Sequence, residues 1–420
     1  MIDVTKPEAL GLSSLRLGRL HNWLDQQVEG GRLAGASVLV GRRGKVGYVG
    51  TAGVSDLDTA EPFREDALVR AYSMTKPIVT AAAMMLYEEG CFQLDDPVSL
   101  YLPEFAKTQV WTGGDISNVM PMESPMLVWQ IMSHTSGLTY GFMQQNAVDA
   151  QYRAVGLDRR GAFANLAEWT KALAGIPLIC QPGTQWNYSV STDVLGRLVE
   201  VWSGTTLDQF LEERMFAPLG MVDTGFKVKP GAESRLVSLY EPEVGAGLGG
   251  VNQVPLEQRR GLKVLEKPEN STYLAQPKVL SGGGGLVSTL ADYSRFCQMM
   301  LGGGELDGMR LLAPSTIRHM RTNHLPDGKD MAQMGQPVWS ETSYDGIGFG
   351  LGFAVVLDPV KAAIITSPGE HHWGGAASTF FWLDPVQDLY VIFLTQLMPS
   401  STYPIRRELR VGVYQAMTEG

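Results

Sequence analysis

Cysteine is scarce in this chain of 420 residues. The three cysteines, Cys91, Cys180 and Cys297, are odd in number, far apart and without C-x-x-C spacing. Such usage argues against a disulfide framework and against a zinc site. We therefore expect three buried apolar fillers, no metal ion and no cofactor.

The chain also has little positive charge and no long apolar run. It carries 34 basic against 44 acidic side chains, a formal net charge of -10 at pH 7. Because nucleic-acid binding usually needs a cationic surface, no nucleic-acid partner is expected. The richest apolar runs, at 78–86 and 390–394, fall short of the roughly 20 residues that span a bilayer. Residues 2–8 lack the features of a secretory signal, which predicts a soluble, cytoplasmic protein without a membrane span.

What the sequence does contain is an apolar share of 44%, enough for a substantial core. Apolar residues spaced by three and four predict an amphipathic helix over 13–29, and a closing helix is expected over 405–417. β-favouring runs bounded by turn residues predict a hairpin near the start and antiparallel strands near the end. These runs lie at 36–40, 46–49, 350–357, 379–383 and 389–395.

The middle of the chain has a different, mostly helical pattern, with helical runs such as 76–89 and 192–203. The simplest interpretation is an α/β domain formed by 1–72 and 291–420, with a helical domain inserted over 73–290. Within the insertion, 227–280 is rich in Gly, Pro and charge and shows little periodicity. Because so long a connection is usually functional, we interpret it as a lid or wall over a cleft.

The strongest local signal is the S-M-T-K sequence from Ser73 to Lys76, followed by a helical run in which Pro77 falls in the first turn. Ser-x-x-Lys at a helix start places the hydroxyl and the amine one turn apart on one face. The helix dipole and a desolvated lysine can then make the hydroxyl a nucleophile. Taken alone, this tetrapeptide is a weak signal, and a capping serine followed by a surface lysine is the more usual interpretation.

Further segments, in order and spacing, make the pattern specific. They are Ser133–Leu138 (S-H-T-S-G-L), Asn187–Val190 (N-Y-S-V) leading into Asp193–Arg197 (D-V-L-G-R), the glycine cluster Gly282–Gly285, and Trp373–Ala376 (W-G-G-A). Together with Ser73 and Lys76 they resemble the serine β-lactamase and penicillin-binding-protein superfamily. The similarity is greatest to its class C branch, and within that to the family VIII carboxylesterases.

This resemblance implies a β-lactamase-like fold, with an antiparallel sheet flanked by helices, an inserted helical domain, and the active site between the two parts. It places the nucleophile at Ser73, the lysine at Lys76 and the tyrosine at Tyr188. A phenol beside an ammonium can donate or accept a proton. The backbone N–H groups of Ser73 and Ala376 would form an oxyanion hole, each donor contributing roughly 3 kcal/mol to transition-state stabilisation.

Two departures from the β-lactamase motifs bear on the substrate. Trp373 stands where a lysine would bind a carboxylate, and Val190 stands where an asparagine would contact an acylamino group. Both changes remove polar recognition and favour a neutral, apolar ester, while the shared machinery allows weak β-lactam hydrolysis. Gly374 and Gly375 would let the substrate approach the strand closely, although strand packing explains these glycines equally well. Three aromatic residues near these motifs could shape the pocket: Trp186, Tyr140 and Phe142. Packing in the core explains them equally well.

Other candidate sites are weaker. The sequence has no Gly-x-Ser-x-Gly, which argues against the α/β-hydrolase nucleophile elbow. His371 and His372 are neighbours on an expected strand and so point to opposite faces, which makes joint metal binding improbable, although one could line the cleft. His134 is interpreted as a structural hydrogen-bonding residue, and the acidic pair at 95–96 as turn residues.

The sequence therefore predicts a serine carboxylesterase that hydrolyses small or short-chain neutral esters through an acyl-enzyme on Ser73. Three alternatives stay open: an acyltransferase to an alcohol, a β-lactamase or D-Ala-D-Ala peptidase, and a non-catalytic binding protein. The partner is a small-molecule ester. The sequence does not identify the physiological ester, the formal base between Lys76 and Tyr188, or the oligomeric state.

Overall fold

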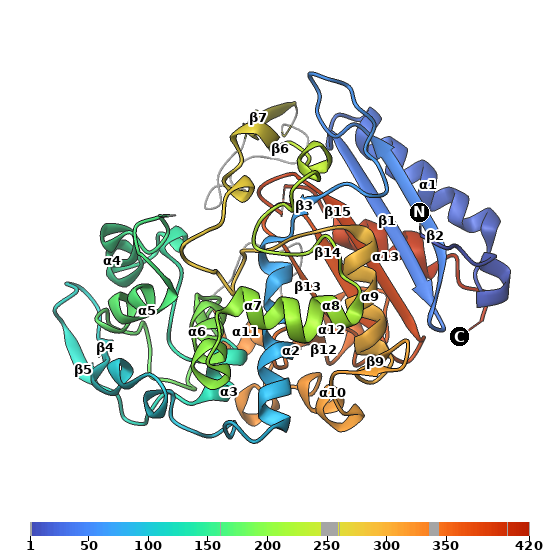
Figure 1. The fold of residues 1–420 in the computed structure, drawn as a ribbon. Helices are drawn as coiled ribbons and strands as arrows, with labels where there is room; N and C mark the ends of the chain where they lie inside the picture. The colour runs from blue at the N-terminus through green and yellow to red at the C-terminus, as the bar shows by residue number, and fades with distance from the viewer. Residues whose placement is uncertain are drawn as a thin grey trace.

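A seven-stranded antiparallel sheet is built from the two ends of the chain (Figure 1). The computed structural model describes residues 2–159, 161–244, 259, 261–335, 344–400 and 402–419. The strand order is β11-β12-β13-β14-β15-β1-β2. The strands are β1 (Gly35–Arg42), β2 (Lys45–Gly53), β11 (Ile347–Phe349), β12 (Ala354–Val356), β13 (His371–Gly374), β14 (Phe380–Asp384) and β15 (Leu389–Thr395).

Pairing of β1 with β15 joins the two ends of the chain. Ala36 lies opposite Thr395, and the register continues to the pair of Arg42 and Leu389. Side chains alternate between two apolar clusters, since Val38 packs on one face and Leu39 on the other. Both faces of the sheet are therefore buried, which explains why its central strands carry few polar residues.

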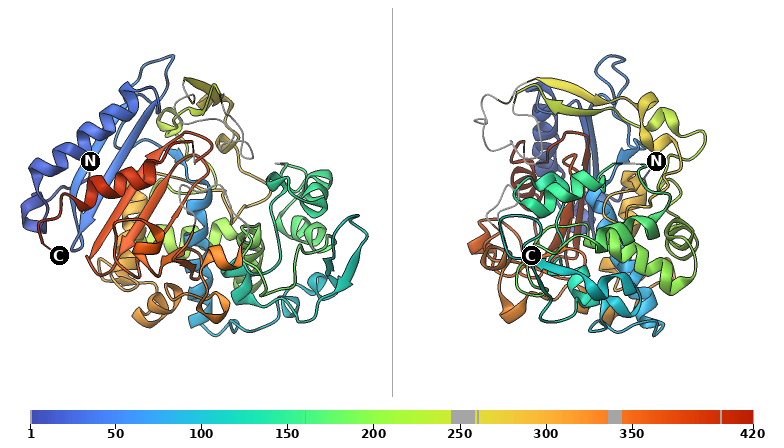
Figure 2. Two further views of the ribbon diagram at one scale, coloured as in Figure 1. Left: turned by 180° about the vertical axis from the view of Figure 1, so that it is seen from behind. Right: turned by 90° about the vertical axis from the view of Figure 1, so that its left-hand side faces the viewer.

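Two helices cover one face of the sheet. They are α1 (Ser14–Glu29) and α13 (Ile405–Tyr414), which lie side by side in Figure 2. Ser13 caps α1 by accepting a hydrogen bond from the Arg16 N–H, so the predicted amphipathic helix is confirmed. The predicted hairpin and closing helix are confirmed as well, although α13 ends three residues earlier than expected.

The predicted strand over 350–357 is wrong in its first half. Residues 350–353 form the turn between β11 and β12, in which the Gly350 N–H donates to the Phe353 carbonyl at 2.9 Å. Gly352 adopts a left-handed backbone with φ of +92°. A glycine at this position ends the strand, because other residues rarely adopt that conformation.

Helix α2 (Thr75–Glu88) lies between the sheet and the helical part (Figure 1). Every residue from Thr75 to Leu86 is buried, so this helix is covered on all sides and belongs to the central core. On the sheet side the core continues into α9 (Leu290–Leu301), which packs against β15 and β1. The other helices are α3 (Val128–Met132), α4 (Ala147–Val155), α5 (Leu166–Ala174), α6 (Ser191–Ser203), α7 (Leu207–Leu211), α8 (Ala217–Leu219), α10 (Pro314–Met320), α11 (Met331–Met334) and α12 (Pro359–Ala362).

Four short two-stranded sheets complete the described secondary structure. They pair β3 (Val69–Arg70) with β8 (Val287–Ser288), β4 (Gln109–Trp111) with β5 (Val119–Pro121), β6 (Leu239–Pro242) with β7 (Leu262–Glu266), and β9 (Glu305–Leu306) with β10 (Met309–Arg310). The β6–β7 pair falls in the predicted lid segment 227–280, of which residues 245–258 and 260 lie outside the described residues. The domain boundaries and the lid remain predictions.

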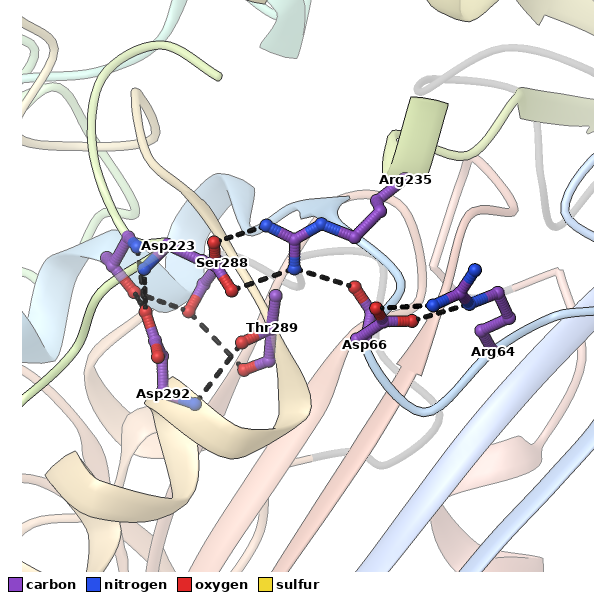
Figure 3. Close-up of polar contacts among 8 residues, drawn as sticks. Arg64, Asp66, Asp223, Arg235, Ser288, Thr289 and Asp292 are labelled. Carbon is purple, nitrogen blue, oxygen red and sulfur yellow. Dashed lines mark hydrogen bonds and ion pairs between the residues drawn. The ribbon is translucent and has the colours of Figure 1, made fainter. Parts of the chain in front are cut away.

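A polar cluster joins the chain just before this segment, at 223–224, to α9 (Figure 3). Asp292 accepts hydrogen bonds from the Asp223 N–H at 2.7 Å, and from the N–H and hydroxyl of Thr224 at 2.7 and 2.8 Å. Arg235 pairs with Asp223 and donates to the carbonyl of Asp66 at 3.3 Å. One buried carboxylate thus satisfies two backbone N–H groups that the turn would otherwise leave without partners.

Candidate active site

Ser73 lies in a short 3-10 turn, Tyr72–Met74, that leads directly into α2. Tyr72, just before it, has a left-handed backbone with φ of 46°. Such conformations in non-glycine residues cost about 1–3 kcal/mol and concentrate at functional sites. The Ala71 N–H donates to the Leu286 carbonyl at 2.9 Å, and the Met74 carbonyl accepts from the Tyr293 hydroxyl at 3.0 Å. The serine is therefore held on both sides by buried hydrogen bonds.

The structure brings Ser73, Lys76 and Tyr188 together. Lys76 Nζ lies 3.1 Å from Ser73 Oγ, and the Tyr188 hydroxyl donates to the same oxygen at 2.5 Å. Lys76 Nζ also stands 4.6 Å from the centre of the Tyr188 ring. A proton leaving Ser73 Oγ can therefore reach either group without passing through solvent.

Lys76 is fully buried, and three neighbours besides Tyr188 surround its amine. It donates to Ser73, to the Tyr140 hydroxyl at 2.9 Å and to the Gly283 carbonyl at 2.7 Å. These three acceptors match the three N–H donors of an ammonium group. Burial, with Tyr188 nearby, raises the pKa of Tyr140 well above its ordinary value, so this phenol is neutral near pH 7.

Tyr188 owes its position to a loop at 133–139. The Asn187 N–H donates to the His134 carbonyl at 2.9 Å, and the Val190 N–H donates to the Thr139 carbonyl at 3.2 Å. Because these two backbone bonds flank Tyr188 in the chain, they fix where its side chain leaves the loop. Helix α6 then begins at once, at Ser191.

Aromatic rings enclose the Tyr188 phenol. The ring centres of Trp373, Trp186 and His134 lie 5.3, 6.4 and 5.1 Å from that of Tyr188. Phe349 in turn packs on Trp373 and Trp186 at 5.3 and 5.7 Å. The reacting groups therefore sit in an apolar environment, which strengthens electrostatic interactions between them.

The glycines after Trp373 allow β13 to lie directly against the Ser73 turn. A Cβ on Gly375 would fall 2.2 Å from Thr379 Oγ1 and 2.5 Å from the Ala71 carbonyl oxygen. A Cβ on Gly374 would meet the Arg406 guanidinium at 2.4 Å. Neither position tolerates a side chain without movement, so the glycines serve close packing and keep Ala376 near Ser73.

A cleft opens beside Ser73, with an empty volume of about 710 Å³ that includes its mouth. Trp186, Tyr188, Trp373, Gly374, Gly375 and Ala376 line it together with Ser73. Two other aromatic residues that the sequence suggested for the pocket lie behind Lys76: the Tyr140 hydroxyl contacts Lys76, and Phe142 stacks on Tyr140 with ring centres 4.5 Å apart, so their role in shaping the pocket stays a prediction.

The histidines have structural partners. His134 Nδ1 lies 3.0 Å from Ser189 Oγ, and burial, with the Lys76 charge, lowers the pKa of His134 well below its ordinary value. His372 lines the cleft and donates through Nδ1 to Glu370 at 2.8 Å, whereas burial lowers the pKa of His371 to about 4. Among the described residues, no group of three or more His, Cys, Asp or Glu side chains could hold a metal ion.

The remaining sequence interpretations concern residues away from the cleft. All three cysteines are free thiols; Cys180 and Cys297 are buried, but Cys91 is only partly buried because it follows the end of α2 in a turn. Asp96 accepts from the Gln93 N–H at 2.7 Å and from the Tyr101 hydroxyl at 2.6 Å, as a turn residue does.

Comparison with known proteins gives the family. The family model described as Beta-lactamase matches residues 20–415. Protein Rv1367c of Mycobacterium tuberculosis is 35% identical over 88% of this chain and 88% of its own length. Esterase EstB of Burkholderia gladioli is 31% identical over 97% and 98% of the two chains. The solved structure of EstCE1, described as a hydrolase with promiscuous acyltransferase activity, has a TM-score of 0.78 and 27% identity, covering 95% of this chain and 99% of that one.

The chain belongs to the Beta-lactamase family and is a serine hydrolase with the β-lactamase and penicillin-binding-protein fold. The expected fold class is confirmed. Within the part of the chain that the structure describes, no helix has the length and apolar character needed to cross a membrane.

Proposed function

We propose that this protein is a serine carboxylesterase that hydrolyses small, neutral esters through an acyl-enzyme on Ser73. One observation carries the proposal: Ser73 Oγ lies within hydrogen-bond distance of both Lys76 and Tyr188, at the edge of an aromatic-lined cleft. A buried amine and a phenol at one hydroxyl form the arrangement of an activated nucleophile.

In the first step, Ser73 Oγ attacks the ester carbonyl carbon. Its proton passes to whichever of Lys76 and Tyr188 is unprotonated when the ester is bound, and that group becomes the acid of the next transfer. Negative charge that develops on the carbonyl oxygen is stabilised by the backbone N–H groups of Ser73 and Ala376. The carbon–oxygen bond to the alcohol then breaks, and the pair returns the proton to the departing alcohol oxygen.

In the second step, water attacks the acyl-enzyme carbonyl. Tyr188, already directed at the Ser73 oxygen, takes a proton from this water, and the same N–H groups hold the oxyanion. The bond to Ser73 Oγ breaks, the proton returns to that oxygen, and the carboxylic acid leaves. Each step is neutral overall and needs no cofactor.

The composition of the cleft supports a neutral, apolar ester. Trp373 presents an indole where a β-lactamase would present a lysine, and Val190 is buried at the start of α6. Neither side chain carries the positive charge that would pair with a carboxylate, and Val190 offers no hydrogen-bonding group to an amide. This composition also supports assignment to the family VIII carboxylesterases, with weak β-lactam hydrolysis as a side activity, and we propose a cytoplasmic location.

Acyl transfer to an alcohol is the second candidate, favoured by the acyltransferase activity in the description of EstCE1. The same acyl-enzyme serves both reactions, and only the acceptor differs. Product analysis with a competing alcohol separates them: dominant ester product at low alcohol concentration would identify a transferase, whereas dominant free acid identifies a hydrolase.

The test of the main proposal is Ser73→Ala, assayed with a short-chain aryl ester and with a covalent phosphonate probe. We expect turnover to be abolished and the probe to label the natural protein at Ser73, as mass spectrometry would show. Retained turnover in the variant refutes the assignment. No adduct on Ser73 would instead support a non-catalytic binding protein.

A further inference from the structure

We propose that Asp193 is a positioning residue that holds Lys76 in place through the turn at 281–283 and provides a buried negative charge close to its amine. This inference rests on the proposed function, because it assigns a role in activating Ser73. The hydrogen-bond partners of the Asp193 carboxylate are Ser281 and Gly283, so it acts on Ser73 through Lys76.

The contacts form a continuous chain. The Asp193 carboxylate accepts from the Ser281 hydroxyl at 2.5 Å and from the Gly283 N–H at 3.1 Å. The carbonyl of the same Gly283 accepts from Lys76 Nζ at 2.7 Å. Because the N–H and the carbonyl belong to one residue, fixing the first fixes the direction of the second.

Gly283 fits this role for a steric reason. A Cβ at this position would lie 2.4 Å from Asp193 Oδ2 and 3.0 Å from the Tyr140 hydroxyl. The turn is thus in van der Waals contact with both groups. A side chain here would push apart the carboxylate, the turn and the phenol that contacts Lys76.

Charge gives the second part of the argument. Lys76 is fully buried and Asp193 is 5% exposed, so water screens the attraction between them poorly. Burial raises the pKa of Asp193, while the Lys76 charge and the bonds from Ser281 and Gly283 act in the opposite direction. An anion close to an ammonium favours the protonated amine.

Other titratable groups also face this pair. Tyr188 and His134 lie on the Lys76 side, and Asp158 adds negative charge near Tyr140 and Asp193. Asp193 differs from Asp158 because it is hydrogen-bonded to the turn that touches Lys76. Removing the Asp193 charge takes away an anion that favours bound protons anywhere in this cluster, so the sign of the effect on the pH profile does not depend on which group is the base.

The experiment is Asp193→Asn, measured as the rate of phosphonate labelling at Ser73 against pH. Asparagine keeps an acceptor for Ser281 and Gly283 but removes the charge. We expect the labelling rate on the plateau above the acidic limb to fall by up to about 10-fold, because removing the charge makes the proton acceptor a weaker base. The acidic limb of the profile should move to lower pH by roughly one unit.

Asp384→Asn is the matched control. Asp384 is fully buried and accepts from the Val386 and Gln387 N–H groups and from the Tyr414 hydroxyl, in the turn between β14 and β15. This variant should lose stability without moving the acidic limb. An Asp193→Asn profile with the same limb position as the natural protein would overturn the inference.

Ser281→Ala keeps the inference testable if Asp193→Asn does not fold. It removes one donor to the carboxylate but retains the charge, so we expect slower labelling without a shift of the limb to lower pH. Unchanged labelling would count against the positioning role. Since labelling at Ser73 is the readout throughout, failure of the Asp193 inference remains distinct from failure of Ser73 as nucleophile, which would show as no adduct in any variant.

Discussion

Tyr188→Phe tests the proposed proton transfer most directly. The substitution removes only the hydroxyl that donates to Ser73 Oγ at 2.5 Å, and leaves the ring that packs on Trp373 and His134. A positioned general acid or base usually accelerates a reaction by about 10²–10⁴-fold. We therefore expect kcat for a short-chain aryl ester to fall about 10³-fold, equivalent to about 4 kcal/mol of barrier height.

The free energy of unfolding of Tyr188→Phe should change much less than its activation barrier. One buried hydrogen bond contributes about 1 kcal/mol, which for a chain of this length shifts Tm by no more than about 2–4 °C. Tyr390→Phe is the control, since the buried Tyr390 hydroxyl bonds Gln298 at 2.9 Å on the sheet, away from the cleft. Tyr390→Phe should lose as much Tm as Tyr188→Phe does, but it should keep the kcat of the natural protein. A Tyr188→Phe enzyme with a kcat within about threefold of the natural one would refute the reasoning.

Three further predictions concern packing and charge. Gly375→Ala should lower both kcat/KM and Tm, because its Cβ would fall 2.2 Å from Thr379 Oγ1. Gly18→Ala is the control, because Gly18 lies on the exposed side of α1 with open space around its Cβ. This variant should keep full activity and raise the free energy of unfolding in urea by about 1 kcal/mol. Burial alone would raise the pKa of Glu370, but the Arg410 charge and its hydrogen bonds hold this pKa well below the ordinary value. The ionised Glu370 therefore stabilises the fold above about pH 4, and this stabilisation is lost as the pH falls further. Glu370→Gln should lower Tm at pH 7 and flatten the acid dependence of Tm in melts recorded over a pH series. Asp292→Ala should lower the free energy of unfolding in urea by about 2–4 kcal/mol, since it leaves the Asp223 and Thr224 N–H groups without their acceptor. A loss below about 0.5 kcal/mol would contradict the role given to that cluster.

Secondary structure at the ends of the chain could be predicted because its signals are local. The spacing of Leu17, Leu20 and Leu24 defines the buried face of α1, and the turn at 43–44 sits between two β-favouring runs that pair as β1 and β2. The prediction failed at 350–357, where Gly352 turns the chain instead of extending it. A glycine fits either conformation, and only the packing of β11 on β12 decides between them.

In the candidate site, too, some contacts follow from local sequence and others only from packing. Ser73 and Lys76 are three positions apart, so the geometry of one turn brings them together whatever surrounds it. Tyr188 was placed by resemblance to a family, because it is 115 residues from Ser73 and no local pattern predicts that contact. Tyr140 was expected in the pocket for its aromatic ring, whereas its hydroxyl contacts Lys76 across 64 residues.

The sequence alone therefore determined the pairing of Ser73 with Lys76 and which short segments form helices and strands, since both depend on residues close together in the chain. Tertiary structure decided what surrounds the amine of Lys76. The Gly283 carbonyl is 207 residues from Lys76, and the Asp193 carboxylate is 90 residues from the Gly283 N–H. Such contacts follow from how α2, α6 and the turn at 281–283 pack, and packing depends on the whole core at once.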